Sequence, residues 1–600
     1  MGSGKKSDLT DLCLCRPRPG RGHEKEHKGG LLPVATLGGI TVGTLTLTIG
    51  FIVGAPVVTL IVMSFRQGLP GRAGPLGLAN YREVFLDPST FRVLLDTTFF
   101  AFGTIAVTLL FALPIVWLLN RTNLPFKKTI YLLMIVGILV PTFLRTIGWI
   151  LLLSPEIGLI NQLARALLGL RDPPFSLYSI VGMAFVQGIS FVPAAFFMVS
   201  TAYRAMDPAL EEAAYTSGVS KTRTFFKINL PITVPAIAAV MVYLLMTAFS
   251  VFEVPAILGL PSGIFVLSSV IYFAVAPHVG LPKYGLAGAY GLIMLAIGLG
   301  TSLLYFRIIR EGRRYEVVTG RGYRPKLIEL GRYKWMGLAF MLLYFALEIF
   351  MPFAVLLWAS LLPYLQVPSP EALSQVSLAN YVSIPQYVGA RPFLNTLVLV
   401  SVAPALSIAA SIPVSWIVVR TRFRLRAVLD LFTFLPHAVP PILFAVALAY
   451  LALVYRDVVP LYGTVFVIAI AHAISYLSYG SRCMNSAMIQ IHPELEEAGR
   501  ACGVSPLRVI RRITVPLVSS AIFDGWLWIA LLSYREVTMA LVLYSPGSEV
   551  VSTLIWTMWS SGNVPQVSAL GVVMIMIVLV LVGLLRAIFV RGRAGTYAHV

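Results

Sequence analysis

Charged residues are scarce in this chain. Only 12% of its 600 residues are Asp, Glu, Lys or Arg, and 58% are hydrophobic, whereas soluble globular proteins average about 25% charged and 45–50% apolar residues. This composition excludes a soluble enzyme built from several domains.

Motifs for nucleotide and metal binding are also lacking. No Gly-x-x-x-x-Gly-Lys-Ser/Thr phosphate loop occurs, so any ATP that drives this protein must be hydrolysed by a separate polypeptide. His278, His437 and His472 are isolated along the chain. Cys13 and Cys15 have no His or Cys pair at zinc-binding spacing. We therefore expect no catalytic residue, no bound cofactor and no metal site.

Long hydrophobic runs, by contrast, recur along the whole chain. They are continuous over roughly 20 residues, the length that crosses a bilayer as a helix, and they lack the polar–apolar alternation of barrel strands. The sequence therefore predicts an all-α polytopic membrane protein with about 12 transmembrane helices. The expected spans are approximately 38–63, 94–119, 130–153, 178–202, 233–258, 285–307, 335–360, 393–418, 429–453, 462–485, 518–543 and 567–590.

The net charge of +20 is unevenly distributed over the loops. When the N-terminus is placed in the cytoplasm, 35 of the 46 Lys and Arg residues fall in cytoplasmic segments, as the positive-inside rule requires. Both termini are therefore expected in the cytoplasm, with the lipid bilayer as a partner. The basic excess then indicates topology, and no nucleic-acid partner is expected.

The chain contains the same pattern twice. Leu-Ala-Asn-Tyr occurs at 78–81 and again at 378–381. Because each copy holds six expected spans, the two copies have the same orientation and are expected to be related by a pseudo-twofold axis along the membrane normal. The first copy has extra residues, which we place in the external stretch 154–174. Further matched residues are Pro114 and Pro413, Trp117 and Trp416, Arg121 and Arg420, Pro141 and Pro440, Gly288 and Gly571.

This repeat divides the chain into two halves with short flanking parts. The expected parts are a basic cytoplasmic tail at 1–33, a first half of six spans at 34–309, a cytoplasmic linker at 310–333, a second half of six spans at 334–590 and a cytoplasmic tail at 591–600.

Two cytoplasmic segments, 203–231 and 489–516, are too polar to be spans but carry helix signals. In the first, Glu211 and Glu212 lie in an expected first helical turn, where the helix dipole stabilises negative charge, and Gly218 ends the helix. A second short helix then runs to a proline at the membrane entry. The sequence predicts a helix–turn–helix at the cytoplasmic face, once in each half.

These segments resemble the signature loop of permeases of binding-protein-dependent ABC importers. That loop contains Glu-Ala-Ala, a Gly six residues after the Glu, and a hydrophobic-X-hydrophobic-Pro element. The first copy reads Glu212-Ala213-Ala214, Gly218 and Ile228-Asn229-Leu230-Pro231, and the second reads Glu497-Ala498-Gly499, Gly503 and Ile513-Thr514-Val515-Pro516. The second copy departs from the pattern at Gly499. The resemblance extends from about residue 34 to 590 and is strongest to fused two-half permeases for ferric iron uptake.

The resemblance implies a type I permease fold in a bacterial or archaeal plasma (inner) membrane. It implies a homodimer of cytoplasmic ATP-binding subunits that uses ATP, and an extracytoplasmic binding protein that delivers the substrate, ferric iron. Polyamine, thiamine and phosphonate importers have related permeases, so these substrates stay open. The implied docking residues are Glu211, Glu212, Ala213, Ala214, Gly218, Pro231, Glu496, Glu497, Ala498, Gly503 and Pro516.

Ionisable residues inside spans are candidates for the translocation pathway. Glu253 and Glu536 occupy matching positions near the external end of the fifth span of each half, so we expect them to face each other across the axis and to attract a cation. A local ion pair of Glu536 with Arg535 is the alternative. Glu348 and Asp524 are expected to be interhelical hydrogen-bond partners. Each fifth span is followed by a stretch rich in Pro and Gly, 255–282 and 544–565, which we expect to form a broken or re-entrant helix at the gate.

Two other functions are alternatives to an importer permease. A secondary transporter driven by an ion gradient would require charged pairs in the spans and leaves the duplicated loops unexplained. An intramembrane enzyme would require a nucleophile and base, or a metal cluster, at a common depth, and no such set is visible in the sequence.

Overall fold

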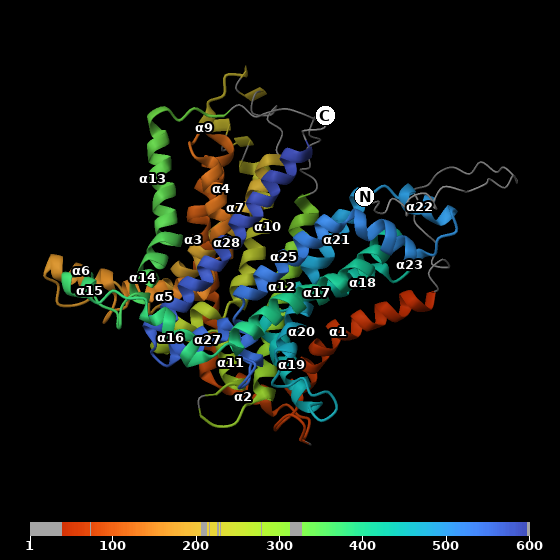
Figure 1. The fold of residues 1–600 in the computed structure, drawn as a ribbon, viewed down its shortest axis with the longest axis horizontal. Coiled ribbons are helices and arrows are strands. Elements are labelled where there is room, and N and C mark those ends of the chain that lie inside the picture. Colours follow the sequence, from red (N-terminus) through yellow and green to blue (C-terminus); the bar gives the residue numbers. More distant parts are fainter. Residues whose placement is uncertain are drawn as a thin grey trace, which may run out of the picture.

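The protein is helical, as expected, in the computed structural model (Figure 1). The structure describes residues 39–72, 74–205, 213–214, 216–224, 227–228, 230–277, 279–312 and 327–596. Within these residues there is no β-strand, and two isolated backbone bridges are present.

The described part of the first half contains five long hydrophobic helices, two bent helix pairs and several short helices. Its elements are α1 (Gly39–Phe65), α2 (Ala79–Leu86), α3 (Pro88–Arg121), α4 (Lys127–Leu139), α5 (Thr142–Leu153), α6 (Leu159–Leu168), α7 (Ile180–Ala205), α9 (Lys221–Thr224), α10 (Leu230–Ser250), η4 (Pro255–Gly259), η5 (Leu260–Ser262), α11 (Leu267–Val275) and α12 (Tyr284–Gly312).

The second half repeats this order with small differences. Its elements are η7 (Gly331–Tyr333), α13 (Lys334–Phe345), η8 (Ala346–Phe350), α14 (Met351–Ser360), α15 (Pro370–Ser374), α16 (Ala379–Val388), α17 (Arg391–Arg420), α18 (Arg426–Ala438), α19 (Pro441–Val454), α20 (Val465–Ser475), α21 (Leu477–Gln490), α22 (Glu494–Ala501), α23 (Pro506–Val509), η9 (Ile510–Thr514), α24 (Val515–Leu517), α25 (Ser519–Arg535), α26 (Thr538–Leu543), α27 (Val551–Ser560) and α28 (Val564–Thr596).

Several expected spans are bent rather than straight. Among the described residues, eight helices are long and apolar enough to cross a bilayer, or up to 12 when each bent pair counts as one span. The third span of each half is such a pair, because α4 and α5 meet at 95° and α18 and α19 at 101°. Pro141 and Pro440 stand at these breaks. Proline lacks an N–H and holds the preceding residue extended, so the helix ends there.

Two further spans of the second half are also interrupted. The expected tenth span is divided into α20 and α21, and the expected eleventh span ends at Arg535, before α26 begins at Thr538. Pro-containing η4 and η5 meet α11 at 86°, in agreement with the broken helix expected after the fifth span.

The repeated Leu-Ala-Asn-Tyr motif makes the same hydrogen bonds in both halves. The side-chain amide of Asn80 donates to the carbonyls of Ser64 and Arg66 at the end of α1, at 2.9 and 3.0 Å. Asn380 donates in the same way to Ser360 and Leu362 at the end of α14, at 2.9 and 2.8 Å. The motif therefore closes the first hydrophobic helix of each half by satisfying its free carbonyl groups. The extra residues of the first half lie where expected, because they include α6 between α5 and α7.

The first hydrophobic helix of each half packs against its own half, through α12 and α28, and also against the other half. Helix α1 packs against α18 and α19 of the second half, and α14 packs against α5 of the first half. The contact between α5 and α14 is close, since a Cβ added at Gly148 would lie 2.8 Å from the Pro352 carbonyl oxygen. The halves therefore form one interlocked body.

A buried ion pair joins the halves at the α5–α14 contact. The Arg145 guanidinium lies 2.9 Å from the Glu348 carboxylate, and both side chains are almost completely buried. Arg145 also donates to the carbonyls of Glu348 and Gly137, at 3.1 and 3.0 Å. Glu348 lies in η8, a π-helical turn between α13 and α14. Glu348 is thus an interhelical partner, as expected, and Arg145 is the residue that it binds.

Removal of one member of this pair should destabilise the protein strongly. Arg145→Met leaves the Glu348 carboxylate buried without a counter-charge, and we expect a loss of about 3–5 kcal/mol in unfolding free energy. Arg145→Met combined with Glu348→Leu should recover most of it. Thermal unfolding of the purified protein measures both, with Arg92→Met in the exposed Arg92–Asp96 pair as the control. Equal losses in the single and double variants would contradict the assignment.

Candidate functional site

The second polar loop, 489–516, has the predicted helix–turn–helix form. Helix α22 carries Glu494, Glu496 and Glu497 in its first turn. The helix is closed by Gly503, whose φ is +78°, a value that glycine adopts without strain. A second short helix then begins at Pro506.

The described part of the first loop closes in the same way. The φ of Gly218 is +77°, and the Val219 N–H donates to the Ala214 carbonyl at 3.0 Å. In the second loop, the Val504 N–H donates to the Gly499 carbonyl at 3.3 Å. The two loops therefore share one turn geometry. Figure 1 shows α9 and α22 on the upper side of the molecule, while α2 and α16 lie on the lower side.

The predicted docking residues divide into exposed and buried ones. Glu211 and Glu212 lie outside the described residues. Ala214 is buried, and Glu496 is completely buried, so their side chains face the permease-like body and not a partner. The exposed predicted residues are Ala213, Gly218, Pro231, Glu497, Ala498, Gly503 and Pro516.

The two predicted pathway carboxylates come together where the halves meet. Glu253 follows the end of α10 and interacts with Arg535, Glu536 and the backbone of Phe143. Arg535 donates a hydrogen bond to the Ile138 carbonyl of α4, so a residue of the second half reaches the first half here. Glu253 of the first half and Glu536 of the second half therefore lie within electrostatic range of each other.

Glu536 is also bound locally. Its carboxylate accepts from the Met539 N–H at 2.8 Å and from the Ala540 N–H at 3.4 Å, which caps α26. The His472 Nε2 atom lies 3.2 Å from the same carboxylate. No group of three His, Cys, Asp or Glu side chains suited to a metal ion occurs among the described residues.

The two short helices that follow the fifth spans, α11 and α27, are held by matched bonds. The Leu267 N–H of α11 donates to the Thr97 hydroxyl of α3 at 3.0 Å. The Val551 N–H of α27 donates to the Thr396 hydroxyl of α17 at 2.8 Å. In each half, a threonine of the long second helix thus fixes the start of the short helix.

Equivalent aromatic side chains of these short helices touch. Alignment of Leu267 with Val551 places Tyr272 opposite Trp556, and their ring centroids are 6.3 Å apart. Equivalent residues of two halves related by a twofold axis can meet only near that axis. Phe252 packs on both rings, with centroid distances of 4.7 and 5.7 Å. An aromatic cluster of Phe252, Tyr272 and Trp556 therefore lies where the two halves meet.

A cavity of about 730 Å³ adjoins this cluster, because Tyr272 also lines the cavity. Its wall comes from both halves. Other lining residues are Arg72, Tyr284, Arg456, Asp457, Tyr462 and Tyr544.

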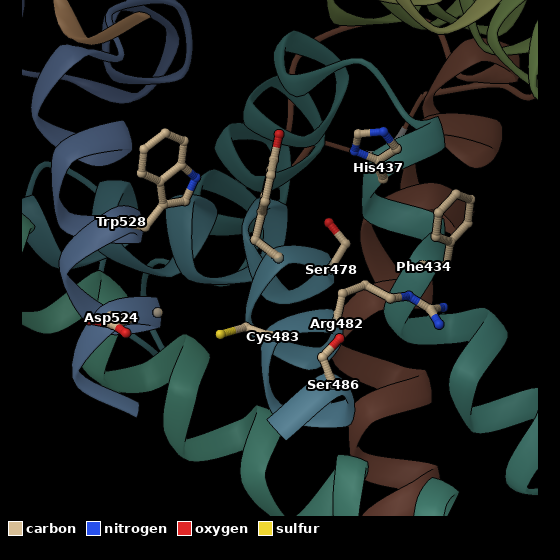
Figure 2. Close-up of a pocket in the computed structure, with 10 residues that line it drawn as sticks. Phe434, His437, Ser478, Arg482, Cys483, Ser486, Asp524 and Trp528 are labelled. Atoms are coloured by element: carbon tan, nitrogen blue, oxygen red, sulfur yellow. The ribbon is translucent and has the colours of Figure 1, made fainter. Parts of the chain in front are cut away.

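A second cavity, of about 490 Å³, lies between α18, α21 and α25 (Figure 2). Figure 2 shows Trp528 and Asp524 of α25 facing His437 of α18 and Cys483 of α21 across it. Asp524 is therefore a wall residue of a cavity, whereas the sequence suggested an interhelical partner. Its two charged wall residues, Asp524 and Arg482, match the uncharged Ala239 and Phe197 of the first half.

Comparison with known families identifies the chain. Residues 105–313 and 407–593 both match the family described as "binding-protein-dependent transport system inner membrane component". The chain belongs to this family. It is therefore the multi-pass membrane permease of a binding-protein-dependent ABC importer, in fused form, and each matched segment contains one of the two polar loops.

Curated relatives of this permease carry related names. The ferric transport system permease protein FbpB of Actinobacillus pleuropneumoniae is 24% identical over 549 residues, which are 89% of this chain and 77% of the relative. The putative ferric transport system permease protein FbpB 1 of Haemophilus influenzae is 27% identical over 65% of this chain and 60% of its own length. The putative 2-aminoethylphosphonate transport system permease protein PhnV of Salmonella typhimurium is 24% identical over 26% of this chain and 57% of its own length.

Among solved structures, a chain of a bacterial ABC transporter involved in the import of the acidic polysaccharide alginate is similar. It is 19% identical, with a TM-score of 0.37, over 47% of this permease and 96% of that chain.

Several residues of the site were not predicted from the sequence. Tyr272 and Trp556 differ in type, so their equivalence is visible only after the neighbouring Ser268 and Ser552 are aligned. His472 is isolated in the sequence, yet its Nε2 atom lies close to the Glu536 carboxylate.

Proposed function

We propose that a homodimer of cytoplasmic ATP-binding subunits drives this permease by docking on its two cytoplasmic loops. The observation that carries the proposal is the pair of loops with one turn geometry on one side of the molecule. Two equivalent sites fit the symmetry of a dimer. The exposed Ala213, Gly218, Ala498 and Gly503 have little side-chain bulk and permit close approach of a partner.

The substrate, delivered by an extracytoplasmic binding protein, passes along the axis between the halves. The aromatic cluster of Phe252, Tyr272 and Trp556 closes this route next to the 730 Å³ cavity, which Tyr272 also lines. Movement of the halves separates Tyr272 from Trp556, because the two residues belong to different halves. The arrangement fits alternating access between two repeats.

The substrate is ferric iron, and Glu253 and Glu536 line its route. Two observations support this assignment: relatives named as ferric transport permeases align with most of the chain, and Glu253 directly follows Phe252 of the aromatic cluster. A cation that passes the open cluster meets a carboxylate next, which attracts it and offers a hard oxygen ligand. A phosphonate is the second candidate, because a 2-aminoethylphosphonate permease is also similar to part of the chain.

Bulky residues at the loop glycines should block docking. Gly218 and Gly503 have open space around them in the permease, so leucines there project toward the partner. We expect Gly218→Leu with Gly503→Leu to weaken binding of the ATP-binding subunits at least about tenfold, as truncation or clash at an interface centre does. Titration of the labelled subunit onto the reconstituted permease measures this.

The matched control is Gly169→Leu with Gly562→Leu, because both glycines also end helices with positive φ and open surroundings but lie in other loops. Equal binding by the two double variants would sink the docking proposal.

Cross-linking of the aromatic cluster should stop transport reversibly. In a chain with its cysteines replaced by serine, Tyr272→Cys with Trp556→Cys places two thiols on neighbouring helices of different halves. A short bis-methanethiosulfonate reagent should join them and abolish uptake into proteoliposomes, and reduction should restore it. A single cysteine at the exposed Leu281 is the control. Full transport by the cross-linked protein would show that the route lies elsewhere.

Radioactive ferric iron tests the substrate. The permease, its ATP-binding subunits and its iron-loaded binding protein should give ATP-dependent iron uptake, and Glu253→Gln should lower the maximal rate because one attracting charge is lost. ATP-dependent uptake of 2-aminoethylphosphonate or a polyamine, without uptake of iron, would reassign the substrate.

A further inference from the structure

The two neighbouring glutamates of the second docking loop have opposite environments. Glu497 is exposed, while Glu496 is completely buried. The Glu496 carboxylate accepts from the Trp416 indole at 3.1 Å and from the Thr514 hydroxyl at 3.0 Å. It also forms an ion pair with Arg420, at 3.4 Å. Trp416 and Arg420 lie at the cytoplasmic end of α17, so Glu496 ties the docking helix to that long helix.

Arg420 extends this joint to a third helix. Its guanidinium donates to the carbonyls of Met488 and Ile491 at the end of α21, at 2.7 and 2.6 Å. A buried carboxylate with a counter-charge and two neutral donors is held in one position, since loss of any partner leaves a buried polar group unsatisfied. The ends of α17 and α21 and the start of α22 are therefore joined through two side chains.

The departure from the family pattern at Gly499 strengthens this joint. A Cβ at Gly499 would lie 2.7 Å from the Ile513 Cδ1 atom and 3.5 Å from Val509. Glycine thus lets α22 lie flat against the following helical segment, which contains Thr514, a partner of Glu496. The docking helix has little freedom to rock independently of α17.

The opposite end of α17 holds the aromatic cluster. Thr396 is 20 residues before Trp416, a distance of about 30 Å along a helix, which matches the thickness of the hydrocarbon core. Its hydroxyl accepts from the first N–H of α27, the helix that carries Trp556. Helix α17 is continuous over this length, although it contains Pro404 and Pro413.

We infer that α17 transmits movement between the docking loop and the aromatic cluster. Glu496 and Thr396 are the positioning residues that couple it to each. The inference rests on the proposed docking of ATP-binding subunits. Movement of α22 pulls α17 through Glu496, and α17 moves α27 and Trp556 through Thr396. The sequence indicates the same device in the first half, where Glu211, Trp117 and Arg121 match Glu496, Trp416 and Arg420, and Thr97 binds α11 as Thr396 binds α27.

The test follows the cluster directly and needs no knowledge of the substrate. A cysteine-free chain with Thr557→Cys carries one thiol beside Trp556. The complex with its ATP-binding subunits and binding protein is labelled from outside with a charged methanethiosulfonate, with and without trapping by ATP and vanadate. We expect trapping to raise the labelling rate about tenfold in this background. Glu496→Gln, Trp416→Phe and Thr396→Val should each reduce that increase to less than about twofold.

Two further measurements separate coupling from docking and folding. Binding of the ATP-binding subunits should be unchanged in Glu496→Gln, Trp416→Phe and Thr396→Val, whereas Glu497→Gln, at the exposed face, should weaken it. Trp416→Phe removes one donor and keeps a large ring, so it tests the joint even if Glu496→Gln does not fold. Thr98→Val, beside Thr97 but exposed, is the control for hydroxyl loss.

The outcomes distinguish the inference from the function on which it rests. Because both contacts act through the same helix, α17, Glu496→Gln combined with Thr396→Val should have no larger effect than either change alone. A full labelling increase in the folded single variants would contradict the inference that α17 transmits the movement. The inference would also be contradicted if these variants lost binding of the ATP-binding subunits as much as they lost the labelling increase. If trapping changes nothing even without these substitutions and the subunits do not bind, the proposed docking itself is wrong.

Discussion

The structure depends on one constraint, that a backbone polar group in a membrane must find a partner within the protein. A straight helix satisfies most of its backbone groups through its own hydrogen bonds. The helices of this permease are broken repeatedly, and each break leaves N–H and C=O groups without a partner in the helix. Side chains then supply the missing partners: Asn80 and Asn380 at the ends of the first helices, Thr97 and Thr396 at α11 and α27, and Arg145 at the bend of α4 and α5. The polar residues of the spans are therefore placed at the breaks.

Duplication explains why most of these devices occur twice, and the exceptions mark where the halves differ. Arg145 and Glu348 have no counterparts, and the position matched to Phe252 is Arg535. The first half thus contributes a ring to the aromatic cluster where the second half contributes a guanidinium that bonds to Ile138 of the first. A fused chain permits such asymmetry, because each half evolves against one fixed partner, whereas identical subunits must be self-complementary.

Much of the fold could be predicted from the sequence, because hydrophobic length and the repeat are local signals. The repeat located the two loops, and Gly218 and Gly503 have the left-handed conformation that their helix-ending role requires. The sequence did not reveal the bends at Pro141 and Pro440, since proline also occurs inside the unbroken α17. Nor did it separate Glu496 from Glu497, because burial depends on which face of a short helix meets Trp416 and Arg420, and those residues are distant in sequence.

The burial of Glu496 changes how the signature loop is to be understood. A loop that only bound a partner would need exposed residues alone, yet one of its two glutamates is directed inward and paired with the end of a membrane helix. Binding of a partner at the exposed face can drive transport only if it changes the conformation of the gate. A loop that moved independently of the membrane helices would not produce that change. The packing of α1 and α14 against both halves limits independent movement further, because each of these helices contacts its own half and the other. The contacts of Glu496 therefore join the docking loop to α17, whose other end is bonded to the helix that carries Trp556.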